Sequence, residues 1–165
     1  MKNINGYIWT LIVALLVSCT ESVKNAEKVE RLPDIYPDYI GVTIPAGIAP
    51  MDFNVEENGC VKVDVIAKGS KQGEIHIQGE WAEWDVDEWH ELTRQNIGGS
   101  IDITVRVKTE DGQWKEYRTF KMYVSQYPLD DFGITYRRIQ PGYEVGGNIG
   151  IYQRDIHSFD EYPMM

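Results

Sequence analysis

The densest group of chemically useful side chains lies between positions 80 and 91, where the sequence reads EWAEWDVDEWHE. Indole rings can stack on the apolar faces of sugar rings, and carboxylates can accept hydrogen bonds from sugar hydroxyl groups. Tryptophans and glutamates alternate here at short spacing. The sequence therefore indicates a candidate glycan-binding site made of Trp81, Trp84, Glu80 and Glu83.

The same segment has a structural interpretation that needs no ligand. Asp85 and Glu88 have the spacing of a capping box, in which the aspartate accepts hydrogen bonds from the first backbone amides of a helix. Trp89 would then anchor the helix in the core, and acidic residues of the first turn would face the positive end of the helix dipole. We favour this interpretation, because it accounts for most of the cluster.

Signals for catalysis or metal binding are weak. A glycosidase needs two carboxylates ~5–10 Å apart in a cleft, and sequence proximity does not indicate such a pair in a chain with 26 acidic residues. His76, His90 and His157 are scattered along the sequence, and no two of them have the spacing of metal ligands. The sequence predicts no enzyme activity, no metal site and no cofactor.

The N-terminus has a pattern typical of a bacterial lipoprotein signal. Lys2 supplies a positive charge, and residues 8–17 form an apolar run that is too short to span a bilayer core, which takes ~20 residues. The tetrapeptide that ends at Cys19 resembles a lipobox, and this resemblance implies cleavage before Cys19 and lipidation of its thiol. We expect a signal peptide over residues 1–18 and a protein anchored by lipid in the cell envelope, at the periplasmic or surface side of an outer membrane.

Charge and cysteine content narrow the choice of partners. The formal net charge is −10, and an acidic protein repels phosphate groups, so nucleic acid is not an expected partner. Residues 19–34 are mostly polar and predict a flexible tether between lipid and domain. Because lipidation would consume Cys19, Cys60 has no partner for an internal disulfide and is expected to be a partly buried, unreactive thiol.

Alternation of apolar and polar residues predicts two hairpins in the middle of the chain. Strands over 60–65 and around 75–77 are joined by a glycine turn, and a strand over 101–107 returns through an Asp-Gly turn as one long strand over 114–124. A proline-rich segment over 35–50 should form an interrupted edge of the sheet, because proline cannot donate to a strand ladder.

One helix and two further extended segments complete the predicted elements. The helix should begin after Asp85 and end near Gly98, and the extended segments cover 134–139 and 149–156. Short strands, hairpin turns and a single helix predict an all-β fold, namely an immunoglobulin- or fibronectin III-like antiparallel β-sandwich with one short helix. The sandwich domain should cover residues 35–127, followed by an extended C-terminal segment over 128–165.

Four stretches of the sequence stand out by their motifs, namely residues 35–45 (IYPDYIGVTIP), 48–53 (IAPMDF), 136–144 (YRRIQPGYE) and 149–154 (IGIYQR). Together they resemble the amino-terminal region of Gram-negative TolB-like β-propeller lipoproteins, sometimes labelled cytochrome c biogenesis proteins. The resemblance implies the domain order of that family, in which a small sandwich domain precedes a haem-attachment element, Cys-x-x-Cys-His, and then a propeller. This sequence contains neither the element nor blade repeats, so no haem ligand is assigned, and we expect a truncated or split gene whose downstream module is missing.

These observations lead to two functional hypotheses. The first is a lipid-anchored, non-catalytic interaction or presentation domain whose partner is an envelope protein. The second is a glycan-binding module, which requires Trp81 and Trp84 to be exposed and coplanar on one flat face.

Overall fold

The structure is a computed structural model, which describes residue 23 and residues 25–127, 133–139 and 150–164. The expected signal peptide and Cys19 lie outside this part of the chain. Among the described residues, no helix is both long and apolar enough to cross a membrane.

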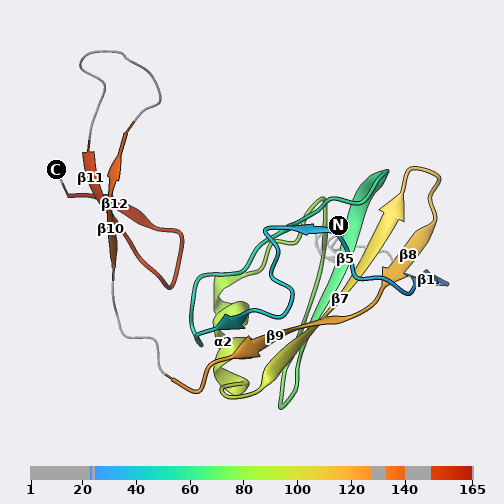
Figure 1. The fold of residues 1–165 in the computed structure, drawn as a ribbon, viewed down its shortest axis with the longest axis horizontal. Helices are drawn as coiled ribbons and strands as arrows, with labels where there is room; N and C mark the ends of the chain where they lie inside the picture. Colours follow the sequence, from blue (N-terminus) through green and yellow to red (C-terminus); the bar gives the residue numbers. More distant parts are fainter. Residues whose placement is uncertain (1–22, 24, 128–132, 140–149, 165) are drawn as a thin grey trace, which may run out of the picture.

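Strands dominate the described residues, and one helix interrupts them (Figure 1). The strands are β1 (Glu27–Val29), β2 (Ile35–Tyr36), β3 (Thr43–Ile44), β4 (Asn54–Val55), β5 (Cys60–Gly69), β6 (Glu74–Gly79), β7 (Ser100–Thr109), β8 (Trp114–Tyr117), β9 (Phe120–Val124), β10 (Ile134–Arg138), β11 (Gly150–Arg154) and β12 (Glu161–Pro163). Helix α2 (Val86–Gln95) lies between β6 and β7 in the sequence. The predicted all-β, sandwich-like fold with one short helix is confirmed.

The main sheet is built around the two longest strands, β5 and β7. Its order is β1-β8-β7-β5-β6, while β9 pairs with the other half of β7 and carries β3 at its outer edge. Most pairs are antiparallel, but β1 runs parallel to β8 and β3 runs parallel to β9. The sheet is therefore mixed, in contrast to the purely antiparallel arrangement expected from hairpins alone.

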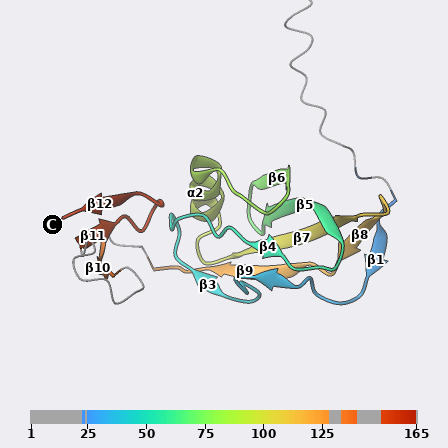
Figure 2. The ribbon, with the colours of Figure 1, turned by 90° about the horizontal axis from the view of Figure 1, so that it is seen from above.

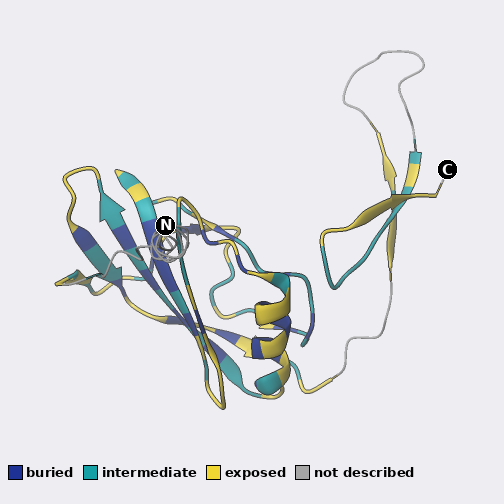
Figure 3. Ribbon diagram, turned by 180° about the vertical axis from the view of Figure 1, so that it is seen from behind, coloured by how far each residue is buried: buried dark blue, intermediate teal, exposed yellow. Residues whose placement is uncertain are grey.

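The core lies on the face of the main sheet that α2 and the small β2–β4 sheet cover. Apolar residues of β5 and β7 alternate with polar ones, so that Val63, Val65, Ile103 and Val105 all point into the core with no exposed surface. Phe53 joins the layers, since its ring contacts Phe120 of β9 at a centroid distance of 6.3 Å. Figure 3 shows the buried stripes of these strands and the single buried face of α2.

Helix α2 begins and ends close to its predicted positions. The Asp85 carboxylate accepts hydrogen bonds from the backbone N–H groups of Asp87 and Glu88, both at 3.0 Å, which confirms the N-cap. The C-cap is Asn96, and Gly98 adopts a positive φ of 69° two residues later. The helix and β1 lie at opposite ends of the main sheet (Figure 2).

Two predictions about the strands need correction. The long strand expected over 114–124 is broken at Arg118, because β8 and β9 pair with different halves of β7 and the Arg118 N–H donates to the carbonyl of Arg31 instead. The tether expected over 19–34 is structured at its C-terminal end, where β1 extends the sheet. Arg31 also pairs with Glu57 through two hydrogen bonds of 2.5 and 2.7 Å.

The C-terminal segment forms a small sheet of its own, in the order β10-β11-β12. Two extended segments were expected here, and β12 is a third. The loop between β11 and β12 packs against the proline-rich segment of the main domain: the Ala49 N–H donates to the Ile156 carbonyl at 2.9 Å, and His157 Nδ1 lies 2.7 Å from the Gly47 carbonyl oxygen. These contacts bring residues near position 159 close to the main domain.

Candidate binding surfaces

The structure separates the two tryptophans of the predicted glycan site. Residues 81–84 are extended and are held to the segment before β4 by a bridge between Phe53 and Ala82. Alternation in an extended chain turns Ala82 and Trp84 inward and Trp81 and Glu83 outward. Trp84 is only 3% exposed, whereas Trp81 is 41% exposed.

Trp84 belongs to the hydrophobic core. Its indole ring stacks on that of Trp89 at a centroid distance of 5.5 Å, and its Nε1–H donates to the Met51 carbonyl at 3.1 Å. The expected exposed, coplanar pair of tryptophans is therefore wrong. The anchor role that the structural interpretation gave to Trp89 is confirmed, since this ring is completely buried.

The outward-facing residues of the same segment line two hollows. One hollow, of about 390 Å³, lies against the end of β6 and includes Glu80, Trp81 and Glu83. The second, also of about 390 Å³, shares Trp81 and Glu83 with the first and brings in Tyr39, Asp52 and Phe159 from distant parts of the sequence. Glu80 and Glu83 are exposed, as a binding role would require.

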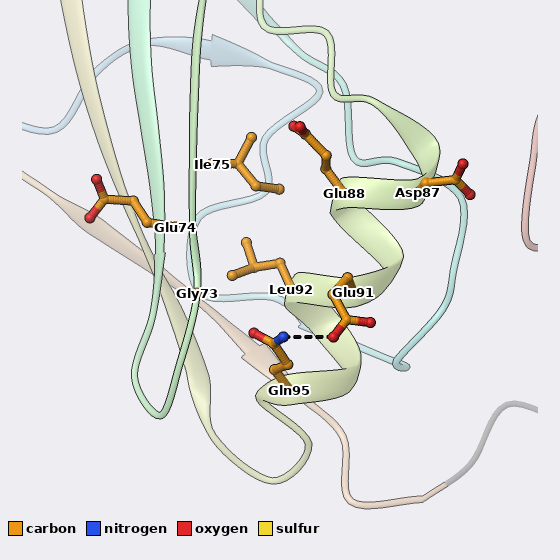
Figure 4. Close-up of a pocket in the computed structure, with 8 residues that line it drawn as sticks. All are labelled: Gly73, Glu74, Ile75, Asp87, Glu88, Glu91, Leu92 and Gln95. Carbon is orange, nitrogen blue, oxygen red and sulfur yellow. Dashed lines mark hydrogen bonds between the residues drawn. The ribbon is translucent and has the colours of Figure 1, made fainter.

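A third hollow is a groove of about 400 Å³ between β6 and α2 (Figure 4). Ile75 and Leu92 point toward each other from strand and helix and form an apolar floor, with exposed fractions of only 6% and 3%. Two carboxylates of the helix, Glu88 and Glu91, lie beside this floor, and the lining includes no lysine or arginine. Glu74 points to the opposite side of β6, where it pairs with Lys68 at 3.7 Å, and Asp87 points away from the floor. Such a groove offers apolar contact area and a negative electrostatic potential together.

The groove keeps its shape through packing between the start of β6 and the last turn of α2. Gly73 has a positive φ of 86°, and a Cβ atom there would lie 2.7 Å from Gln95 Oε1 and 3.0 Å from Leu92 Cδ1. Only glycine fits this approach without displacing the helix side chains. The Gln95 amide also donates to Glu91 at 2.6 Å, which fixes one carboxylate of the rim.

The outer face of the main sheet carries a row of polar side chains centred on Asp64. This carboxylate is fully buried and accepts from Arg106 Nη1 at 3.1 Å and Gln78 Nε2 at 2.6 Å, with His76 Nε2 at 2.7 Å. Arg106 in turn donates to Glu116 at 2.7 Å. Because both Asp64 oxygens already have protein partners, this row stabilises the sheet and offers no free carboxylate to a substrate.

Histidines and cysteines do not assemble into a reactive centre in the part of the chain that the structure describes. His90 and His157, which sequence analysis treated as separate, lie edge to face at 6.2 Å, and His90 Nε2 is 2.8 Å from the His157 carbonyl oxygen. No group of three or more His, Cys, Asp or Glu residues among the described ones could hold a metal ion. Burial raises the pKa of the partly buried Cys60 thiol, and this shift disfavours the reactive thiolate.

Of the residues that line the second hollow, the sequence pattern indicated Trp81 and Glu83 alone. Tyr39 and Asp52 lie roughly thirty to forty positions before Trp81 in the sequence, and Phe159 lies almost eighty positions after it. These side chains therefore come together only through the fold. The only sequence signal was indirect, since Tyr39 and Asp52 stand in the segments that carry the resemblance to TolB-like lipoproteins.

Comparisons with known proteins add no relative to this picture. No protein-family model matches the chain, and no curated protein matches it.

Proposed function

We propose that this protein is a lipid-anchored, non-catalytic binding domain of the bacterial cell envelope, and that its main partner is an envelope protein. The observation that carries this proposal is the groove between β6 and α2. Its apolar floor and the carboxylates of Glu88 and Glu91 suit a segment that is apolar on one side and carries lysine or arginine on the other. Complementary charge favours a correct encounter and disfavours acidic competitors.

The anchor rests on the sequence pattern that ends at Cys19. A lipid there would hold the acidic domain beside a membrane whose anionic headgroups would otherwise repel it. The resemblance to TolB-like lipoproteins supports the same location, and a propeller or secretion component encoded on another chain would be a suitable partner. Incorporation of radiolabelled palmitate into the wild-type chain, and its loss in Cys19→Ser, would support the anchor; equal labelling of both chains would contradict it.

Site-specific crosslinking in intact cells tests the groove. A photoreactive p-benzoylphenylalanine at Gln95 lies at the rim and keeps both Glu88 and Glu91, although it removes the hydrogen bond from the Gln95 amide to Glu91. The same residue at exposed Arg118 lies between β8 and β9 and serves as the control. We expect a discrete adduct from position 95 that is strongly reduced when Glu88 and Glu91 are changed to lysine. No adduct, or the same adducts from both positions, would contradict a protein partner at this groove.

Glycan binding is a less well supported alternative, because the single observation in its favour is the exposed indole of Trp81. The structural role of Trp84 removes half of the expected platform. Glu80, Trp81 and Glu83 would remain as its ligand-binding residues. A glycan array in which Trp81→Ala abolishes the signal would support this alternative.

A further inference from the structure

The second hollow differs from an ordinary sugar site in its charge. Its walls are Tyr39, Pro50, Asp52, Trp81, Glu83 and Phe159. Three aromatic rings and two carboxylates therefore meet in a volume of about 390 Å³, and no lysine or arginine is among the lining residues. A neutral ligand would leave both negative charges without a partner.

The carboxylates in this hollow are not neutralised by other described residues. Asp52 Oδ1 accepts the Trp84 backbone N–H at 2.9 Å, and no ion pair of Asp52 or Glu83 occurs within the described part of the chain. Partial burial and the nearby Glu83 charge raise the pKa of Asp52, although the Trp84 N–H opposes this shift. Burial and the Asp52 charge likewise raise the pKa of Tyr39. Burial is the main cause of both shifts, and the repulsion between neighbouring negative charges adds to it.

The aromatic rings point to the same kind of ligand. The faces of aromatic rings attract cations, and four rings of the described chain carry an arginine or lysine within 5.8 Å of the ring centroid. One of them is Phe159, which has Arg154 at 4.9 Å, although Arg154 does not line the hollow. No such cation lies over Trp81 or Tyr39 among the described residues.

We infer that the hollow between Tyr39, Trp81 and Phe159 binds an organic ammonium group, with Asp52 and Glu83 as its counter-charges. The ammonium would lie near both carboxylates, and its alkyl stem would pack on the aromatic rings, as cations do in aromatic cages. A lysine side chain of a protein and a free small amine share this chemistry. This hollow and the groove between β6 and α2 have no lining residue in common, so either proposal can fail without the other.

A titration of the full-length, ¹⁵N-labelled chain in detergent micelles tests this inference, with the Trp81 indole N–H resonance as the readout. The probes are Nα-acetyl-lysine N-methylamide, its uncharged norleucine analogue, choline and cellotetraose. We expect a saturable shift with the lysine amide in the millimolar range and at least about tenfold weaker binding of the norleucine analogue. Choline that binds as tightly as the lysine amide would support a small amine as the ligand, and weaker choline would support a protein lysine.

Variants give the matched comparison. Glu83→Gln should weaken binding of the lysine amide about fivefold, and Asp52→Asn should do the same while its side-chain oxygen still accepts the Trp84 N–H. Glu80→Gln is the control, because Glu80 lines only the neighbouring hollow, and it should change the affinity less than twofold.

Unchanged indole resonances of Trp84 and Trp89 would show that each variant is folded. Equal responses to the lysine and norleucine amides, tighter binding of cellotetraose, or no effect of Glu83→Gln would overturn the inference.

Discussion

Asp64 and Arg106 face each other across β5 and β7, and their closest nitrogen and oxygen atoms are 3.1 Å apart. The Asp64 side chain is fully buried, although it points away from the apolar core. Long neighbouring side chains, above all Arg106, cover it on the outer face of the sheet. A buried carboxylate is tolerated only when charged or polar partners replace the lost water.

Removal of the Arg106 charge should therefore destabilise the whole domain. In Arg106→Met the aliphatic cover is largely kept, but Asp64 is left with His76 and Gln78 alone. We expect a loss of about 2–3 kcal/mol in the free energy of unfolding, less than for a completely buried pair because the arginine is partly exposed. Urea unfolding followed by circular dichroism measures this loss. Glu116→Gln, which removes only the outer partner, should cost less than about 1 kcal/mol, and an equal cost for both variants would contradict this assignment.

The two tryptophans of the sequence cluster should respond differently to the same substitution. Trp84→Ala would open a cavity beside Trp89 and Phe53 and should cost about 3–5 kcal/mol. Trp81→Ala removes a largely exposed ring and should change the free energy of unfolding by less than about 1 kcal/mol. Thermal or urea unfolding of both variants checks this difference. Similar losses would mean that Trp81 also has a structural role.

Local patterns predicted much of this fold. The alternating apolar residues of β7, and Val63 and Val65 of β5, indicated the buried face of the sheet correctly. Val61 continues the same alternation in the sequence but is 48% exposed, because the register shifts between Cys60 and Lys62. The Asp85 cap and the Asp-Gly turn before Trp114 also followed from short-range chemistry. The break at Arg118 could not be predicted, since it depends on which half of β7 each neighbouring strand meets.

The binding surfaces were less predictable than the strands. Trp81 and Trp84 have similar sequence surroundings, and contacts with the segment before β4 decide which ring faces the core. These contacts are the Phe53–Ala82 bridge and the hydrogen bonds that Trp84 donates to Met51 and Asp52. The parallel strand β1 was equally hidden, because three mostly polar residues have no apolar pattern of their own. Contacts between distant segments determine both features.

The phenol of Tyr117 provides a spectroscopic test of the contact between the sheet and Glu57. Burial and a hydrogen bond to the Glu57 carboxylate raise the pKa of Tyr117 to about 12. Folding thus favours the neutral phenol over the charged phenolate. The unfolded pKa of a tyrosine is ~10, so this contribution to stability is complete below pH ~10 and is lost as the pH rises toward 12. The difference between the ultraviolet titrations of wild type and Tyr117→Phe should have its midpoint near pH 12 in the folded protein. In guanidinium chloride the midpoint should fall to about 10, and a midpoint near 10 in both solvents would contradict the contact.

The proposed ammonium site depends on how the loop between β11 and β12 is held, and this dependence can be tested at His157. The imidazole Nδ1 lies 2.7 Å from the Gly47 carbonyl oxygen, and Phe159 follows two residues later in the same loop. Loss of one such hydrogen bond costs about 1 kcal/mol, which corresponds to an approximately fivefold larger population of the detached loop. In His157→Ala we expect tryptic cleavage after Arg154 to accelerate about fivefold, with the global free energy of unfolding of the main domain unchanged. Thr135→Ala in β10 is the matched control and should leave the cleavage rate unaltered.

The His157→Ala variant should also bind the lysine amide more weakly, because the detached loop carries Phe159 away from Trp81. Faster cleavage with unchanged affinity would show that Phe159 is dispensable for the site.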